Sequence, residues 1–516
     1  MSSRGRRFVY AVLLPATLTF LFFPFSVDGP IHALDEGIWL SLAQAFHHGQ
    51  RLYSDVWFQY GPLLTVPTRL AVAFDQVTLA DLRMAQLLPN LVWQLIIYAA
   101  LCRWVKDGFL RVSAALALWL CPWAQFTTFV PMAFRYGPAF LAILVWPEPS
   151  ASVRREKNLS LASGASCALA IFISQEIGIA ITVATGAYLA AGENSHKRLR
   201  FFFISWAGVV AVMLGGVALF CGVGAYIQCA FIDIGRFQKM VLIPPPLLES
   251  SFWQSFWQHK GDALFFNFFA IVAASAAPVI SALLALVFYG RRRKAMSRPL
   301  IVGLAFFALA ASGSAWGRAD TPHIYFALPA AILFWAAWAD LIRIRVKRPR
   351  LTGGLSLLIA VMLTAPPYVM RVQIMREQAG QLTASSSLPL GGAKIPLSQA
   401  EMYEELTGDI QTHTKKEEPL LSYPANGAVF LLADRPIGSR FPVLIEGALP
   451  YHQREIIAEM KERPVRWVVM IPTLDNLNGK PPRVWLSDVR AEIGTHYEPR
   501  VDNQRSALLE RKALYK

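Results

Sequence analysis

Residues 32–40 read HALDEGIWL, and this stretch carries two adjacent carboxylates, Asp35 and Glu36, directly after a long apolar run. Ionised side chains are costly beside hydrocarbon, so their position requires an explanation. Two acidic residues here can simply cap the N-terminus of a helix at a solvated loop end. Alternatively, they can take part in a reaction at a membrane surface.

The composition around this stretch is typical of a membrane protein. Of the 516 residues, 55% are hydrophobic and 16% are charged, whereas soluble domains carry about 25% charged residues. The five cysteines lie in or beside apolar runs without metal-ligand spacing, which favours simple burial. Residues 370–516 hold 19 basic and 18 acidic residues, so nearly all of the net charge of +15 lies earlier, between apolar runs. This location indicates membrane orientation and argues against nucleic-acid binding.

The apolar runs predict a polytopic α-helical protein with about 11 spans, within a range of roughly 9–13. The predicted spans are approximately 8–27, 82–102, 109–124, 136–147, 159–173, 176–191, 200–223, 264–289, 299–315, 323–342 and 351–369. Alternate segments between them hold 22 basic residues on one side and 8 on the other. Because cytoplasmic loops are rich in Lys and Arg, we expect a cytoplasmic N-terminus and an extracytoplasmic C-terminus. The first run lacks a small-residue cleavage site and is expected to remain as an anchor.

The pattern changes near residue 385. The runs LLSYP, AVFLLAD, RWVVMIP and SALLERK look like short strands, and HQREIIAEMKERP looks like an amphipathic helix. We therefore predict a membrane domain over 1–369, a linker over 370–394 and a small extracytoplasmic α/β domain over 395–516. The first outer loop, which contains the Asp-Glu pair, is expected at 28–81.

This topology gathers the unusual polar residues on the outer face. Besides Asp35 and Glu36, they are Tyr53, Asp55, Arg83, Arg135, Glu176, Arg318, Asp320 and His323. A carboxylate there can deprotonate a hydroxyl, and arginines can bind a phosphate and stabilise it as a leaving group. The set suits transfer of a group from a lipid phosphate to an acceptor outside the cytoplasm. The sequence has no P-loop or Rossmann glycine pattern, which fits a reaction without a nucleotide.

The segment LDEGIWLSLAQAFHHGQRLYSDVWFQYGPL resembles the first outer loop of GT-C-fold glycosyltransferases that use polyprenyl-phosphate sugars. These include bacterial members related to protein O-mannosyltransferases and lipid A aminoarabinose transferases. The shared pattern is the Asp-Glu pair followed by Gly49, Tyr53, Asp55 and Gly61-Pro62. WGRADTPHIYFALP is similar to a later outer-loop motif of bacterial members. The resemblance implies a juxtamembrane helix over 62–76 and an arginine, Arg83, at the start of the second span.

The resemblance also implies an activity, an inverting sugar transfer at a bacterial inner membrane. The donor would be a polyprenyl-phosphate sugar, and the acceptor an envelope glycolipid, polysaccharide or protein. Asp35 would be the general base, and Glu36 would support it or position substrate. The residues implied to bind substrate or lipid phosphate are Arg83, Arg318, Asp320, His323, Arg135, Glu176, Tyr53 and Asp55.

The chain lacks an acceptor-binding insert of the protein O-mannosyltransferase type, which disfavours a protein acceptor. Some relatives use a divalent metal and others do not, and no ligand spacing here decides between them; no other cofactor is indicated.

Alternatives remain open at this point. Arg83 can be an interfacial snorkelling residue, and Arg318 with Asp320 can be a structural ion pair. A secondary transporter or a non-catalytic protein of envelope assembly would also be a polytopic membrane protein. Transporters place paired charges near mid-bilayer on broken helices, often with internal repeats. Here the charges lie at outer helix ends and no repeat is visible, so the glycosyltransferase interpretation is preferred.

Overall fold

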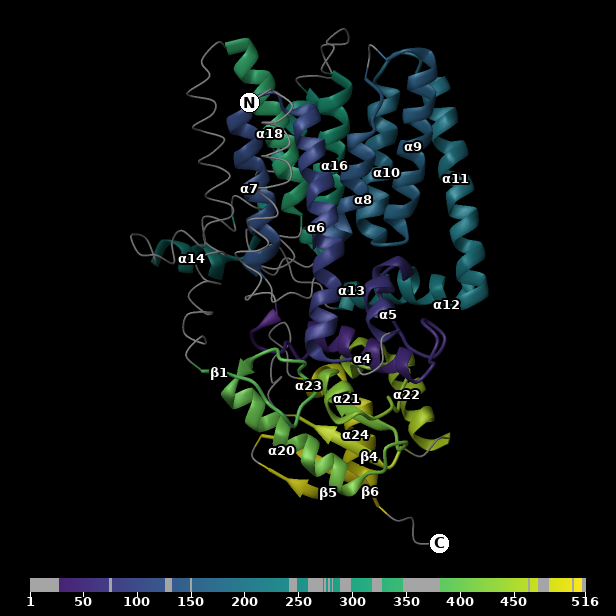
Figure 1. The fold of residues 1–516 in the computed structure, drawn as a ribbon, viewed down its shortest axis with the longest axis vertical. Coiled ribbons are helices and arrows are strands. Elements are labelled where there is room, and N and C mark those ends of the chain that lie inside the picture. Colours follow the sequence, from purple (N-terminus) through teal and green to yellow (C-terminus); the bar gives the residue numbers. More distant parts are fainter. Residues whose placement is uncertain are drawn as a thin grey trace.

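The computed structural model describes residues 27–73, 77–125, 132–148, 151–240, 248–258, 298–317, 327–346, 381–462, 465–471, 482–503 and 505–512, with parts of 272–287. Figure 1 shows a bundle of long helices and, at one end of it, a smaller part that contains both helices and strands. The short helices that follow the Asp-Glu pair lie between these two parts (Figure 1).

Among the described residues, eight long helices build the bundle. They are α6 (Leu79–Trp104), α7 (Gly108–Gln125), α8 (Met132–Leu144), α9 (Val153–Ile171), α10 (Gln175–Ala190), α11 (Ser195–Phe220), α16 (Arg298–Gly317) and α18 (Leu328–Val346). Each coincides with one of the predicted spans. The predicted spans 8–27, 264–289 and 351–369 fall wholly or mostly outside the described residues, so the count of 11 stays a prediction.

Two of these helices, α6 and α11, are long and apolar enough to cross a bilayer by length and composition, with mean hydropathies of 1.4 and 2.2. The apolar stretches Phe134–Leu144 and Arg298–Gly313 are shorter. Only 11% of the most apolar window of α11 is buried inside the protein. Its exposed apolar surface is what contact with lipid requires.

Aromatic rings and small residues pack the interior of the bundle. The rings of Trp146 and Tyr188 stack with their centroids 4.3 Å apart. Gly303 of α16 lies against both residues, and a Cβ at this position would come within 2.8 Å of each. A side chain there would therefore separate α16 from α10.

The first outer loop contains α4 (Asp35–His47), the 3-10 helix η2 (Pro62–Thr65) and α5 (Val66–Val72). The predicted juxtamembrane helix over 62–76 is confirmed as far as Val72, as η2 followed directly by α5. Gly61 allows the loop to touch the end of α9, because a Cβ there would lie 2.1 Å from the carbonyl oxygen of Phe172. That same oxygen accepts a hydrogen bond from the backbone of Leu63 at 2.9 Å. The Gly-Pro motif thus anchors the loop to the bundle.

The C-terminal unit, residues 397–512, surrounds one mixed sheet. Its strands are β3 (Leu420–Tyr423), β4 (Trp467–Met470), β5 (Tyr497–Asp502) and β6 (Ala507–Arg511). Its helices are α20 (Leu397–His413), α21 (Ala428–Ala433), α22 (Pro450–Glu462), α23 (Pro482–Trp485) and α24 (Ser487–His496). A 3-10 turn, η5 (Leu444–Gly447), precedes α22. The strand order is β3-β4-β6-β5, with β3 and β4 parallel and the other pairs antiparallel.

Three of the four predicted strands coincide with β3, β4 and β6, and the predicted amphipathic helix coincides with α22. The fourth prediction was wrong, because AVFLLAD forms helix α21 and its last residue, Asp434, ends the helix with a positive φ of 51°. All six helical residues are buried. A short run that is apolar on every side has no periodicity with which to tell a strand from a helix.

The predicted linker is described only from residue 381 onward. There, β1 (Leu382–Thr383) pairs with β2 (Ile395–Pro396), and Leu388 and Leu390 are buried. The first turn of α6 is bound to this segment by hydrogen bonds from the backbone of Leu79 and Ala80. This part of the connection is therefore packed against the first outer loop.

Candidate active site

Glu36 and Arg83 form a buried ion pair that joins α4 to α6. Arg83 Nε lies 2.8 Å from Glu36 Oε1, and Arg83 Nη2 lies 3.0 Å from Glu36 Oε2. Their side chains are 0% and 1% exposed, respectively. Such a two-point contact between a guanidinium and a carboxylate fixes orientation as well as distance.

The remaining donors of Arg83 bind the chain just before the Asp-Glu pair. They reach the carbonyl oxygens of Val27, Gly29 and Pro30 at 2.5, 3.3 and 3.2 Å. In this arrangement, Glu36 and Arg83 bind each other and the preceding backbone. The phosphate contact of Arg83 and the substrate role of Glu36 stay predictions. Sequence reasoning missed the pairing because the two residues lie 47 positions apart.

Asp35 is not part of this ion pair. It is the first residue of α4, and neighbouring side chains on a helix diverge by about 100°. Its side chain is 39% exposed and lies 3.4 Å from Nδ1 of His32. The backbone N–H of His32 in turn donates to Glu36 Oε2 at 3.1 Å. Asp35 is therefore placed as an accessible carboxyl group at the N-terminus of a helix.

The C-terminal unit closes against α4 beside Asp35. The backbones of Gly37 and Gly427 meet so closely that a Cβ on Gly427 would lie 2.3 Å from the carbonyl oxygen of Gly37. Gln399 forms two hydrogen bonds with the backbone of Ile31, at 2.8 and 3.0 Å. Asp35 therefore lies at a seam between the first outer loop and the C-terminal unit.

Across this seam lies a carboxyl group that the sequence analysis did not select. Glu446, in η5, is 5% exposed, and its buried Oε2 atom has no hydrogen-bond partner among the described residues. Burial raises the pKa of Glu446 well above its ordinary value, and the charge of Asp35 raises it further. The two carboxyls are thus within electrostatic range of each other. The only sequence signal is one acidic residue inside the apolar run FPVLIEGAL.

Two other predicted residues, Arg135 and Glu176, form an ion pair between α8 and α10. Arg135 is buried and also donates from Nε to Ser174 Oγ at 3.3 Å. Its guanidinium lies over the ring of Tyr60, 4.8 Å from the ring centroid. The structure therefore brings these two residues together, at the point where the first outer loop meets the bundle.

Tyr53 and Asp55 shape the first outer loop. Tyr53 is fully buried, has a positive φ of 66°, and donates from its hydroxyl to the carbonyl oxygen of Tyr60 at 2.6 Å. Asp55 pairs with Arg51. Desolvation raises the pKa of Asp55, but hydrogen bonds from Arg51 outweigh it and the net pKa is lowered. These contacts stay within the loop and do not involve Asp35.

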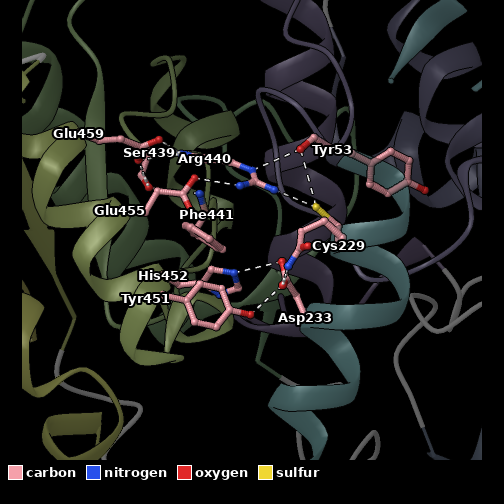
Figure 2. Close-up of polar contacts among 11 residues, drawn as sticks. Tyr53, Cys229, Asp233, Ser439, Arg440, Phe441, Tyr451, His452, Glu455 and Glu459 are labelled. Carbon is pink, nitrogen blue, oxygen red and sulfur yellow. Dashed lines mark hydrogen bonds and ion pairs between the residues drawn. The ribbon is translucent and has the colours of Figure 1, made fainter. Parts of the chain in front are cut away.

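Figure 2 shows a polar interface that the sequence analysis missed, between the π-helix η3 (Gln228–Asp233) and the C-terminal unit. Asp233 accepts a hydrogen bond from the Tyr451 hydroxyl at 2.7 Å and lies 3.1 Å from Nε2 of His452. Burial raises the pKa of Asp233, but hydrogen bonds, first from His452 and then from Tyr451, outweigh it and the net pKa is lowered. The partners are more than 200 positions apart, so no local pattern could predict them.

Arg440 connects the same interface to the first outer loop. It donates to the carbonyl oxygen of Tyr53 at 3.2 Å, to Cys229 Sγ at 2.9 Å and to Glu455 at 2.8 Å (Figure 2). The side chain of Arg440 therefore links the C-terminal unit to both the first outer loop and η3.

The remaining predicted residues, Arg318, Asp320 and His323, lie outside the described residues. Within the part of the chain that the structure describes, no three or more His, Cys, Asp or Glu residues gather in a way that could hold a metal ion. Use of a divalent metal, which the sequence neither required nor ruled out, therefore stays untested.

Comparison with protein-family models and with curated protein sequences found no match. Among solved structures, the chain is similar to ArnT from Cupriavidus metallidurans bound to undecaprenyl phosphate, with 13% identity, a TM-score of 0.57 and 99% of each chain covered. The apo state of that protein gives 14% identity and a TM-score of 0.56, over 96% of this chain and 97% of that chain. The oligosaccharyltransferase of Archaeoglobus fulgidus is less similar, with 14% identity, a TM-score of 0.47, and 96% of this chain and 72% of that chain covered. The likeness to ArnT confirms the GT-C fold that the sequence resemblance implied.

Proposed function

We propose that this protein is a membrane glycosyltransferase that moves a sugar from a polyprenyl-phosphate carrier to an envelope acceptor on the extracytoplasmic face. The observation that carries the proposal is the division of the Asp-Glu pair within a GT-C fold. Glu36 is held in a buried ion pair, whereas its neighbour Asp35 remains accessible at a helix N-terminus. An accessible carboxylate on a rigid support is what a general base requires.

In the proposed reaction, Asp35 removes the proton of an acceptor hydroxyl. The acceptor oxygen then bonds to the anomeric carbon of the sugar, and the bond between that carbon and the phosphate oxygen of the carrier breaks. A single displacement of this kind inverts the anomeric centre. The lipid phosphate leaves with the electron pair, and cationic groups stabilise its charge.

Glu36 and Arg83 act in this proposal by positioning. The ion pair and the three carbonyl contacts of Arg83 hold the N-terminus of α4 and the preceding chain at residues 27–30. Small displacements of a reacting group are costly to the rate. The pair would thus serve Asp35 by keeping its helix in place.

Other groups must neutralise the carrier phosphate. The arginines Arg318 and Arg135 are proposed for this task. Asp320, His323 and Glu176, which is paired with Arg135 at the junction of loop and bundle, are proposed to line the substrate site. The structure of ArnT with undecaprenyl phosphate supports a lipid phosphate as the ligand class. A glycolipid or polysaccharide acceptor is favoured over a protein, and a bacterial inner membrane is the proposed location.

The test compares the wild-type protein with Asp35→Asn in proteoliposomes. The donors are polyprenyl-phosphate-linked hexoses and pentoses, and the acceptor is a total envelope extract of lipids and polysaccharides. General-base catalysis contributes about 10²–10⁴-fold, so we expect a loss of at least about 100-fold with unchanged thermal unfolding. Full activity of Asp35→Asn would remove Asp35 from the proposal. Absence of transfer by the wild type from every donor would overturn the enzyme class.

A further inference from the structure

We infer that Glu446 is the residue that the C-terminal unit contributes to the acceptor site. Its neutral carboxyl group donates a hydrogen bond to an acceptor oxygen beside Asp35. This inference rests on the proposed function, because it gives a role to a second carboxyl at the same seam. It also gives the C-terminal unit a direct part in recognising the acceptor.

The first observation is that Glu446 is buried with an orphaned oxygen. The residue is 5% exposed, and the described residues offer no hydrogen-bond partner to Oε2. Buried polar atoms in folded proteins are nearly always paired, because an unpaired one is destabilising. An unpartnered carboxyl oxygen therefore needs a reason, and a ligand that supplies the missing partner is a direct one.

The second observation is that the backbone on both sides of Glu446 is fixed. The backbone N–H of Ile445 donates to the carbonyl oxygen of Pro424 at 3.1 Å, and that of Glu446 donates to Val443 at 2.9 Å. A Cβ at Gly447 would lie 2.7 Å from the side chain of Ile456. Turn η5 is thus packed into the unit on both sides of Glu446, which fixes the backbone from which the carboxyl group extends.

The third observation is the relation to Asp35. Asp35 is 39% exposed at the start of a helix, whereas Glu446 is enclosed in an apolar run. Desolvation, with the charge of Asp35 added, raises the pKa of Glu446. A buried carboxyl group with a raised pKa can act as a hydrogen-bond donor, while an accessible carboxyl group beside it acts as a base. The base would accept the proton of an acceptor hydroxyl, and the hydrogen-bond donor would bind an acceptor oxygen.

In the resulting arrangement, the acceptor proton passes to Asp35 and Glu446 keeps its own proton throughout. The O–H of Glu446 donates to an oxygen of the acceptor, which orients the attacking hydroxyl and satisfies the orphaned carboxyl. Glu446 forms and breaks no covalent bond. The ligand class that fits is an oxygen-rich acceptor, such as a sugar or a phosphorylated sugar.

The test uses Glu446→Met and Glu446→Gln in the full-length protein, with the assay described above. Loss of one hydrogen bond to substrate should lower kcat/KM for the acceptor extract by about 10-fold in Glu446→Met, while KM for the donor stays unchanged. Glu446→Gln keeps an N–H donor of similar shape and should stay within about 3-fold of the wild type. Glu459→Gln is the matched control, because Glu459 is a carboxylate of the same unit with partners in Ser439 and Arg440, and it should leave the acceptor KM unchanged.

The outcomes separate the inference from the proposed function. Wild-type transfer that Glu446→Met retains in full would overturn the inference alone. A loss in Glu446→Met that appears equally in the donor KM, or together with a lowered unfolding temperature, would indicate a structural role and would also overturn it. Equal losses in Glu446→Gln and Glu446→Met would reject the neutral donor. Absence of transfer by the wild type would overturn the proposed function and this inference together.

Discussion

The carboxylate of Glu36 receives two hydrogen bonds from the guanidinium of Arg83, at 2.8 and 3.0 Å, and both side chains are removed from solvent. The preceding residue, Asp35, shares neither the partner nor the burial. A motif of two adjacent acids is therefore divided into a part that holds the helix and a part that is accessible. Substitution of Glu36 should therefore lower the stability of the protein, whereas substitution of Asp35 should lower its activity.

Glu36→Gln should destabilise the protein strongly. The substitution leaves the charge of Arg83 buried without a counter-charge, which costs about 3–5 kcal/mol in comparable buried pairs. We expect a lower thermal unfolding temperature and weaker expression, measured in detergent by intrinsic fluorescence. Asp35→Asn is the matched comparison and should unfold as the wild type does. Equal unfolding temperatures for the two variants would contradict the structural role of Glu36.

The polar interface of Figure 2 should hold the C-terminal unit against η3. Asp233→Asn and His452→Gln each remove one side of a buried contact of 3.1 Å, and hydrogen bonds to a charged group contribute about 1.5–3 kcal/mol. We expect faster hydrogen exchange over 228–240 and easier proteolysis at the interface in each variant.

A double-mutant cycle makes the same test quantitative. Because the two residues are in contact, the effects of Asp233→Asn and His452→Gln should be non-additive by about 0.5–3 kcal/mol. Lys461→Gln is the control, since the exposed side chain of Lys461 forms an ion pair with Glu492 at 3.4 Å and ion pairs near the surface contribute little. Additive effects of the two interface variants would show that they do not act as one contact.

Much of the fold could be predicted from local patterns. The apolar runs located eight described helices, and the Asp-Glu motif indicated the GT-C fold. The orientation that the basic clusters imply stays a prediction. AVFLLAD was misassigned because its burial on all sides erased the periodicity on which the prediction depended. Figure 1 shows why such local errors did not affect the architecture, because the long helices dominate it.

The candidate site was predictable only in part, for a different reason. Asp35 could be selected from its motif as a candidate residue, but the partner of Arg83 and the position of Glu446 depend on contacts between distant segments. Glu446 lies in a segment with the composition of a buried core, where a single acid gives no motif. The chemistry of a carboxyl depends on what surrounds it, and in this chain the surroundings come from the other end of the sequence.

The burial of Glu446 predicts a pH dependence of stability. Its pKa is raised in the folded protein, first by desolvation and then by Asp35, so the folded state binds more protons than the unfolded state above the ordinary value of about 4.3. The contribution of Glu446 to stability is therefore most favourable below that value and is lost as the pH rises toward the folded-state pKa. Glu446→Gln carries no titrating group and lacks this loss.

We thus expect the unfolding temperature of Glu446→Gln to exceed that of the wild type by a margin that grows between about pH 4.5 and pH 7, since each unit of pKa difference corresponds to about 1.4 kcal/mol. Other ionisable groups are common to both proteins and cancel in the comparison. Glu446→Met is the control, and it should give the same dependence on pH even if its absolute unfolding temperature differs. A margin that stays constant across this range would mean that Glu446 ionises as freely in the folded protein as in the unfolded chain, and a neutral donor beside Asp35 would then be ruled out.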